Sequence, residues 1–349
     1  MSMVPTLVGY LTGRSSSGSG TLAPVDELRL DRFPRVALAH LPTPLEACHR
    51  LRREVGGSLV WLKRDDCTGL ATGGNKTRKL EFLLGRALAA DAPAVVTTGA
   101  LQSNHARQTA AACAHLGLPC HLVLRRAVAR DDEHYLTSGN VLLDRILGAT
   151  VEIVDTVEEA DEAMTRIVST TGAAAIPFGG SDAVGVLGYV AAGLELAEQL
   201  AAAGIEAAKV VTAASSCGTA AGLAIGLAAA GGPPVEAVAV SDDGPMIHAT
   251  TVALIEQTSE LLGIGAPPVP TVIDRHIGPA YGVPTEEGRH AIEALARTEG
   301  VLLDPVYTAK AFAHVLAVPS EGDVVFVHTG GMPDLFAYTP ALTPSPPPR

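Results

Sequence analysis

The sequence predicts a doubly wound α/β fold, in which parallel strands are covered by helices on both faces. Short β-branched runs alternate with longer Ala- and Leu-rich amphipathic runs between positions 59 and 329. Several of the strand candidates are apolar on both faces, as is typical of parallel strands buried between two helix layers. In such sheets ligands bind beyond the carboxyl ends of the strands, so we expect a site in the loops that follow them.

The individual elements follow from local composition. The predicted strands are rich in β-branched residues, and in chain order they are LVWLK (59–63), AVVTT (94–98), CHLVL (120–124), TVEIV (150–154), KVVTA (209–213), VEAVAV (235–240) and DVVFVHT (323–329). Helices are predicted in most of the gaps, among them 80–90, 103–117 and 158–171. Four loops rich in glycine and small polar residues then lie where ligands are expected: GLATGGNKT (69–77), TTGALQSNH (97–105), ASSCGTAAG (214–222) and VHTGG (327–331).

Composition restricts the class of protein. With 47% hydrophobic and 18% charged residues the chain is predicted to be globular, and its net charge of −12 argues against a nucleic-acid-binding surface. The five cysteines include no CxxC pair, which favours a reducing cytoplasm without disulfides or a zinc site. The most apolar stretch, 210–230, is interrupted by Ser, Cys and Thr, and the N-terminus lacks the pattern of a signal peptide. We therefore expect a cytoplasmic protein with a small-molecule ligand, no metal and no membrane or nucleic-acid partner.

The loop around Lys76 resembles a nucleotide-binding loop with one extra residue. Gly69 and Gly74 have the spacing of the phosphate-binding loop of NTPases, but Asn75 separates Gly74 from Lys76. Asp242 and Asp243 follow a hydrophobic strand, as a magnesium-binding pair would. The inserted Asn75 would turn the lysine away from a triphosphate, and Asp-Gly after a strand is also common turn chemistry. An NTPase remains an alternative that is not favoured.

A lysine at a helix start has another use. Glycines allow a planar group to approach the backbone closely. The helix N-terminus, Arg78 and Lys79 would make the surroundings of Lys76 electropositive and favour its neutral amine. A neutral amine condenses with aldehydes, and pyridoxal phosphate binds proteins in this way. The residues 216–219 before a predicted helix could bind the cofactor's phosphate with backbone N–H groups. Taken alone, the Lys76 segment is better explained as a solvated basic helix start, and residues 216–219 as an ordinary helix cap.

Five motifs in order make the chain familiar. GGNKTRKLEFLL, TTGALQSNHARQTAAACAHLGLPCHLVL, GPAYGVPTEEG, LLDPVYTAKAF and VHTGG resemble the D-cysteine desulfhydrase / 1-aminocyclopropane-1-carboxylate deaminase family. The resemblance extends over positions 42–334 and implies a tryptophan-synthase-β-like fold (pyridoxal-phosphate fold type II). It implies a large domain of 21–74 plus 177–338, a small domain of 75–176, an active site in the cleft between them, and a homodimer. A flexible arm (1–20) and a Pro-rich tail (339–349) are expected outside the fold.

The resemblance also implies how pyridoxal 5'-phosphate is held. Lys76 would be the Schiff-base lysine and would move the α-proton, with Asn75 as part of the same motif. Asn104 would donate a hydrogen bond to the phenolic oxygen of the cofactor, and Thr329 would face the pyridine nitrogen. The phosphate would be held by Cys217, Gly218, Thr219 and Ala220.

For the substrate, the resemblance implies a small β-substituted amino acid. Ser103, Asn104 and His105 would contact it, with Ser103 and His105 at its carboxylate, and Tyr281 and Tyr307 would flank it. The expected catalytic residues are Lys76, Ser103, Tyr281 and Tyr307, and the expected reaction is α,β-elimination from D-cysteine or a similar amino acid to an α-keto acid and ammonia.

Three positions depart from the family's pattern. Ala220 stands where Gln or His is typical, and Ala309 where Gly is usual. Thr308 follows the tyrosine of DPVY, where the resemblance implies that deaminases carry a Glu which keeps the pyridine nitrogen protonated. A hydroxyl carries no charge to stabilise a pyridinium, so we expect elimination of a stable anion rather than opening of a cyclopropane ring. L-cysteate sulfo-lyase activity, deaminase activity and a catalytically inactive pyridoxal-phosphate-binding protein remain alternatives.

Overall fold

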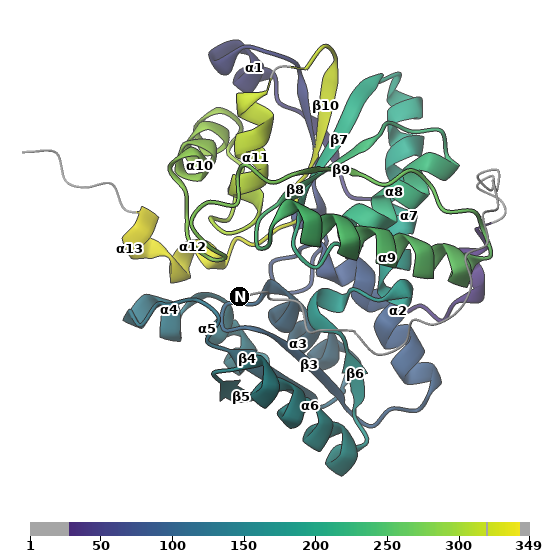
Figure 1. Cartoon of the computed structure of the whole chain (residues 1–349), viewed down its shortest axis with the longest axis vertical. Coiled ribbons are helices and arrows are strands. Elements are labelled where there is room, and N and C mark those ends of the chain that lie inside the picture. Colours follow the sequence, from purple (N-terminus) through teal and green to yellow (C-terminus); the bar gives the residue numbers. More distant parts are fainter. Residues whose placement is uncertain (1–27, 319, 343–349) are drawn as a thin grey trace, which may run out of the picture.

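The computed structural model describes residues 28–318 and 320–342, and these residues form two sheets flanked by helices (Figure 1). The larger sheet has the order β1-β2-β10-β7-β8-β9, and only β1 runs antiparallel to its neighbour. Its strands are β1 (Leu45–Ala47), β2 (Val60–Lys63), β7 (Ala207–Ala214), β8 (Val235–Ala239), β9 (Thr271–Ile273) and β10 (Asp323–Val327). The smaller sheet, β5-β4-β3-β6, is parallel throughout and consists of β3 (Val95–Ala100), β4 (Cys120–Arg125), β5 (Thr150–Val154) and β6 (Ala174–Ile176).

Helices cover both sheets, which confirms the predicted α/β class. They are α1 (His49–Val55), α2 (Lys76–Ala89), α3 (Asn104–Leu116), α4 (Glu133–Thr137), α5 (Gly139–Ile146), α6 (Val157–Thr171), α7 (Ala183–Ala203), α8 (Gly218–Ala229), α9 (Gly244–Leu262), α10 (Glu286–Glu299), α11 (Thr308–Ala317), α12 (Asp334–Ala337) and α13 (Thr339–Leu342), with 3-10 turns at Leu30–Arg32, Asp65–Cys67 and Phe178–Gly180. Helix α2 begins at Lys76, as expected for the lysine motif, and so extends the predicted helix 80–90 by four residues at its N-terminus.

Helix α7 is long and apolar enough, by length and composition alone, to cross a membrane. In this fold 61% of that window is buried, and the helix packs against α2, α8 and α9. A core helix of an α/β domain has the same composition, and burial of this kind identifies α7 as one.

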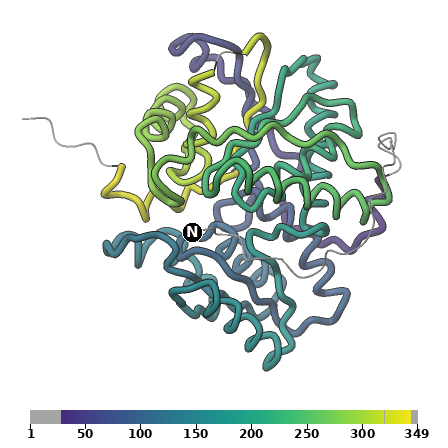
Figure 2. Tube along the Cα trace, in the orientation of Figure 1, coloured from purple at the N-terminus to yellow at the C-terminus, as the bar shows by residue number. Residues whose placement is uncertain are grey.

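The two sheets meet around α2 and α3. All four strands of the smaller sheet lie inside the segment predicted as the small domain, whereas α2, which was assigned to that segment, packs against both α7 and α3. Near the end of the described residues, α12 contacts α4 and α5 beside the smaller sheet, as the trace in Figure 2 shows. The predicted arm 1–20 lies outside the described residues. Of the predicted tail, 339–342 is helix α13, and the rest also lies outside the described part of the chain.

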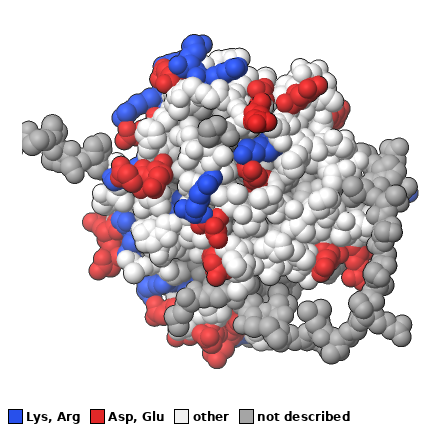
Figure 3. Space-filling model, turned by 45° about the horizontal axis from the view of Figure 1, so that its top comes forward, with Lys and Arg blue, Asp and Glu red and all other residues white. Residues whose placement is uncertain are grey.

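The surface shows no segregation of charge on the face drawn in Figure 3, where acidic and basic residues lie interspersed among uncharged ones. No basic stripe is visible on that face, in agreement with the net charge of −12.

Candidate active site

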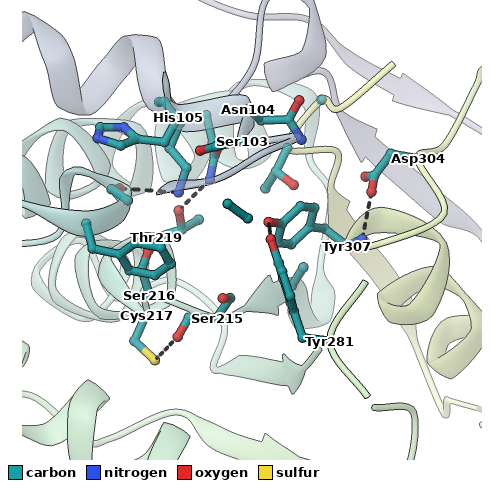
Figure 4. A pocket seen from close by; sticks show the side chains of 18 residues that line it. Ser103, Asn104, His105, Ser215, Ser216, Cys217, Thr219, Tyr281, Asp304 and Tyr307 are labelled. Atoms are coloured by element: carbon teal, nitrogen blue, oxygen red, sulfur yellow. Dashed lines mark hydrogen bonds between the residues drawn. The ribbon is translucent and has the colours of Figure 1, made fainter. Parts of the chain in front are cut away.

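One pocket collects residues from all four predicted loops, at the carboxyl ends of β3, β7 and β10 (Figure 4). Ten of the predicted site residues line it: Asn75, Lys76, Ser103, Asn104, His105, Cys217, Thr219, Tyr281, Tyr307 and Thr329. Gly218 and Ala220 lie behind its wall, in the buried first turn of α8. Ser216, which the sequence analysis offered for the phosphate, also lines the pocket. The other lining residues were not named from the sequence, and they are Ala100, Phe178, Gly179, Ala213, Ser215, Asp304 and Gly330.

The loop before Lys76 needs glycine for steric reasons. Gly73 and Gly74 have φ angles of 72° and 131°, in the region that L side chains rarely adopt. A Cβ on Gly73 would lie 2.1 Å from the Asp66 carbonyl oxygen, and one on Gly74 would lie 2.6 Å from Gln108 Nε2. The loop can therefore turn tightly and place Lys76 as the first residue of α2, at the pocket wall.

Burial sets the chemistry of the Lys76 amine. Its Nζ donates to the Gly179 carbonyl oxygen at 3.3 Å, and burial lowers its pKa to about 8. Lys79, one turn later, is fully buried and donates to the Ser181 hydroxyl at 2.9 Å and to the same Gly179 carbonyl at 3.3 Å. Burial, and then the charge of Lys76, lowers the pKa of Lys79 well below its ordinary value. Burial therefore favours the neutral form of both amines, and the charge of Lys76 acts in the same direction on Lys79 alone.

The other basic neighbour predicted to act on Lys76 does not do so. Arg78 lies on the opposite side of α2, where its guanidinium donates to the buried Asp65 carboxylate at 2.9 Å and to Glu195 at 2.9 and 3.0 Å. Tyr189 donates to the same Asp65 at 2.6 Å. This cluster anchors the first turn of α2 to α7 and fixes the position of Lys76 from behind.

The N-terminus of α8 forms a cradle for an anion. The first intrahelical bond runs from Ala221 N to Cys217 O, so the N–H groups of Thr219 and Ala220 have no acceptor within the helix. Asn75 Nδ2 donates to the Thr219 hydroxyl at 2.9 Å, which links the lysine loop to this turn. Any Cβ on Gly218 would lie 2.6 Å from the Ser181 hydroxyl and 2.8 Å from Lys79 Nζ. Glycine at this position thus allows the second buried amine to reach the cradle.

The N-terminus of α3 forms the facing wall. Ser103 caps the helix by accepting from Ala106 N at 3.1 Å. The ring of His105 turns toward the smaller sheet, where its Nε2 lies 2.9 Å from the Thr97 hydroxyl, and Thr97 donates to the Ile176 carbonyl oxygen. Since that hydroxyl's proton is used, Nε2 is the donor and Nδ1 is left as a buried atom with no partner. What α3 can offer a carboxylate is therefore its first backbone N–H groups and the Ser103 hydroxyl, more than the His105 ring.

Two tyrosine hydroxyls lie 2.5 Å apart on the side of the pocket formed by α11. Tyr281 comes from a loop that Lys310 secures by donating to the Ile277 and Ala280 carbonyl oxygens at 2.6 and 3.3 Å. Tyr307 precedes α11, and Figure 4 shows the two rings at an angle to each other with their hydroxyl groups meeting at the cavity. Burial raises the pKa of both hydroxyls, so each keeps its proton at neutral pH. The pair can donate a proton and pass a second one across its short hydrogen bond.

Thr308 does not line the pocket. It is fully buried, and its hydroxyl donates to Asp304 Oδ2 at 2.6 Å. Asp304 does line the pocket, but its carboxylate also accepts from the backbone N–H groups of 306, 307 and 308, at 2.7 to 2.9 Å. This carboxylate is therefore committed to the first turn of α11. Thr329 lies in the lining, and its carbonyl oxygen accepts from Asn75 N at 3.0 Å.

The acidic pair of the NTPase alternative lies away from the pocket lining. Asp243 caps α9 by accepting from Met246 N at 2.9 Å, and Asp242 accepts from the Ser241 hydroxyl at 2.8 Å. Within the described ranges, no group of three or more His, Cys, Asp and Glu side chains could hold a metal ion. Nothing in the geometry supports a magnesium nucleotide here.

Comparison with known proteins gives a consistent family. The model of the pyridoxal-phosphate dependent enzymes matches residues 36–330. The D-cysteine desulfhydrase of Klebsiella pneumoniae (strain 342) is 44% identical over 330 residues, which are 90% of this chain and 98% of that protein. A crystal structure described as an ACC deaminase homologue has 37% identity and a TM-score of 0.81, covering 90% of this chain and 96% of the other. The serine racemase of maize, 18% identical with a TM-score of 0.62 over 89% of this chain and 95% of that one, shares the fold.

The pocket fits the family's cofactor on independent physical grounds. It presents a buried lysine whose pKa is lowered to about 8 and an anion cradle that a Cβ on Gly218 would fill. An amine for an aldehyde and a helix N-terminus for a phosphate are the two features that pyridoxal phosphate requires. The chain belongs to the pyridoxal-phosphate dependent enzymes of fold type II, in the D-cysteine desulfhydrase and 1-aminocyclopropane-1-carboxylate deaminase family, and is a lyase that works by elimination or deamination with this cofactor.

Proposed function

We propose that this chain catalyses α,β-elimination from a small β-substituted amino acid such as D-cysteine, yielding pyruvate, ammonia and sulfide. The observation that carries the proposal is the position of the Tyr281–Tyr307 hydroxyl pair in the pocket that also holds the Lys76 amine. Such an arrangement supplies a base for the α-proton and a separate acid for a departing thiolate. The names of the relatives, which are D-cysteine desulfhydrases, support the same substrate.

The residues that would hold the cofactor follow from the geometry. Lys76 would bind its aldehyde carbon, and the α8 turn with Thr219 and the nearby Lys79 would bind its phosphate. Asn104 would donate to its phenolic oxygen, and Thr329 would lie at its ring nitrogen. When bound, pyridoxal phosphate supplies an electron sink for the carbanion that remains once the α-proton has left.

The protein's own groups would then perform the proton transfers. The Ser103 hydroxyl and the first N–H groups of α3 would bind the substrate carboxylate, because a helix N-terminus favours an anion. A neutral Lys76 would accept the α-proton. The tyrosine pair would donate a proton to the sulfur as the Cβ–S bond breaks, and water would then convert the released enamine to keto acid and ammonia.

The lining discriminates between leaving groups. A sulfonate, as in L-cysteate, keeps its charge before it leaves and would require a cation, yet Lys76 is the one Lys or Arg among the described lining residues. A thiol is neutral in the bound substrate and suits the tyrosine pair. Ring opening of 1-aminocyclopropane-1-carboxylate gives no stable anion, and the resemblance implies that it requires a carboxylate at the pyridine nitrogen. Asp304 is the carboxylate among the described lining residues, and it already accepts four hydrogen bonds from the first turn of α11. We therefore propose a thiol substrate over the other two.

Two further properties are proposed from the family alone. We infer a homodimer, as implied by the resemblance, and a cytoplasmic location, which agrees with five free cysteines among the described residues. Sedimentation of the purified chain would test the first, and fractionation of the source cells would test the second.

The test is a product assay with a panel of amino acids. The loaded enzyme should release pyruvate and sulfide from D-cysteine and pyruvate and chloride from β-chloro-D-alanine. It should release little α-ketobutyrate from 1-aminocyclopropane-1-carboxylate and little sulfite from L-cysteate. Comparable α-ketobutyrate release would refute the leaving-group argument, and a loaded protein that is inert toward the whole panel would favour a binding protein without catalysis.

A further inference from the structure

Asp334, at the start of α12, is a fully buried carboxylate that accepts hydrogen bonds from two side-chain amides, one on α3 and one on α5. Asn104 Nδ2 donates to its Oδ2 at 2.9 Å, and Asn140 Nδ2 donates to its Oδ1 at 2.8 Å. Asn104 lines the pocket, whereas Asp334 does not. Among the described lining residues, Asn104 is the one that donates a hydrogen bond to this carboxylate.

The oxygen of that amide is held by donors. Asn140 Nδ2 lies 3.0 Å and Arg107 Nη2 lies 3.3 Å from Asn104 Oδ1. A guanidinium has no acceptor atom and keeps its charge in proteins. If the Asn104 amide were flipped, its NH2 group would face these donors and its oxygen would face the Asp334 carboxylate, so the surroundings permit one orientation.

These contacts use the amide oxygen and one N–H, and they leave a second N–H. Figure 4 shows the Asn104 amide nitrogen nearer to the cavity than its oxygen, which is turned away. We propose that Asp334 is a positioning residue, which fixes Asn104 as a hydrogen-bond donor toward the phenolic oxygen of the bound cofactor. This inference rests on the cofactor placement in the proposed function.

The cost of burying Asp334 argues against a purely structural role. Burial, reinforced by the Asp304 carboxylate, raises the pKa of Asp334 well above its ordinary value. Burying the ionised carboxyl group therefore costs more free energy than burying an apolar side chain of similar size. Replacing buried charges with apolar side chains is often neutral or stabilising. The network also reaches the lysine loop, since Arg107 Nη1 donates to the Ala71 and Gly73 carbonyl oxygens at 2.6 and 3.0 Å. It thus holds the loop of Lys76 and the Asn104 amide in one frame.

The test uses the visible absorption band of the loaded enzyme without substrate. An oxygen that loses a donor to its anionic form becomes more basic, so the pH midpoint at which the band titrates should rise. Asn104→Ala and Asp334→Ala should each raise it by about 1 pH unit, since an unsatisfied buried hydrogen bond corresponds to about a tenfold change in equilibrium. The double variant should rise no further than Asn104→Ala alone, because both changes remove one interaction.

Asp144→Asn is the matched control. Asp144 is a second fully buried carboxyl whose pKa is influenced by Arg107, but neither of its oxygens has a hydrogen-bond partner. Its replacement should leave the midpoint unchanged. If Asp334→Ala does not fold, Asp334→Leu serves instead, because its side chain is close in size and accepts no hydrogen bond from either amide; the midpoint should again rise.

An Asp334 variant that melts at a lower temperature but titrates like the wild type would overturn the inference, as would additive shifts in the double variant. Because no substrate is present, this result is independent of the proposed reaction. An enzyme inert toward D-cysteine that still shows the coupled shifts would refute the reaction and leave the role of Asp334 intact.

Discussion

The lowered pKa of Lys76, about 8, places a change of protonation within the working pH range of most enzymes. The free amine attacks an aldehyde, and its protonated form does not. Below about pH 8 the folded apoprotein holds Lys76 charged, and above it neutral. The rate at which the apoprotein takes up pyridoxal phosphate should therefore rise through about pH 8 and level off, as followed by the visible band after mixing.

Lys310 complicates this experiment, because burial also lowers its pKa to about 8. A Lys310→Met variant separates the two lysines. It should keep the same midpoint for cofactor uptake, because Lys310 contacts the Tyr281 loop and not the lysine loop. Loss of the midpoint in this variant would assign the titration to Lys310.

Lys76→Ala should take up no cofactor that borohydride can fix covalently, while its circular dichroism stays that of the wild type.

The two tyrosines should separate catalysis from cofactor binding. Their hydroxyls bond to each other, and no hydrogen bond joins either of them to the described residues of the lysine loop or of the α8 turn. Tyr281→Phe or Tyr307→Phe should lower kcat by about 10²- to 10⁴-fold, as loss of a general acid does. The Kd for the cofactor should change by no more than about twofold. A parallel loss of cofactor affinity would place these hydroxyls at the cofactor instead.

At the scale of elements, the first turn of α8 tests the phosphate cradle. Gly218→Ala would place a methyl group 2.8 Å from Lys79 Nζ. The affinity for the cofactor should therefore fall by about tenfold, which corresponds to about 1.4 kcal/mol. Gly117→Ala is the control, because Gly117 ends α3 with φ 70° and open space around it. It should cost about 1 kcal/mol of stability without changing cofactor affinity. Equal affinities in the two variants, measured by fluorescence titration, would contradict the cradle.

The elements also show how far the sequence could predict the fold. Strands of four residues or more, such as β3 and β7, carry enough β-branched residues to be recognised. The strands β1, β6 and β9 have three residues each, too few for a periodic pattern, and were not predicted. Arg78 was misplaced for a related reason: adjacent helical residues point about 100° apart, and proximity in sequence to Lys76 does not mean proximity of side chains.

Within the site, motifs predicted the residues that occur in loops after strands. They could not predict contacts between distant segments. Asp334 meets Asn104 across 230 positions, and the commitment of Asp304 to the turn of α11 depends on the backbone path. The sequence pattern indicates which residues share a helix or strand. Hydrogen bonds such as that between Asn104 and Asp334 form only when the two sheets pack against α2 and α3.

At the scale of the whole molecule, the pocket is lined by elements that follow strands of both sheets, and ligand binding should stabilise the elements on both sides. Pyridoxal phosphate would contact α2 and α8, beside the larger sheet, and α3, which leads out of the smaller one. At about 100 times its Kd, a ligand that binds only the folded state adds about 2.7 kcal/mol of stability. Hydrogen exchange should therefore slow at the N-termini of both α8 and α3 when the cofactor binds. Protection of α8 alone by pyridoxal phosphate would mean that the cofactor does not span the two sheets, and the predicted contacts of Ser103 and Asn104 would then have to be abandoned.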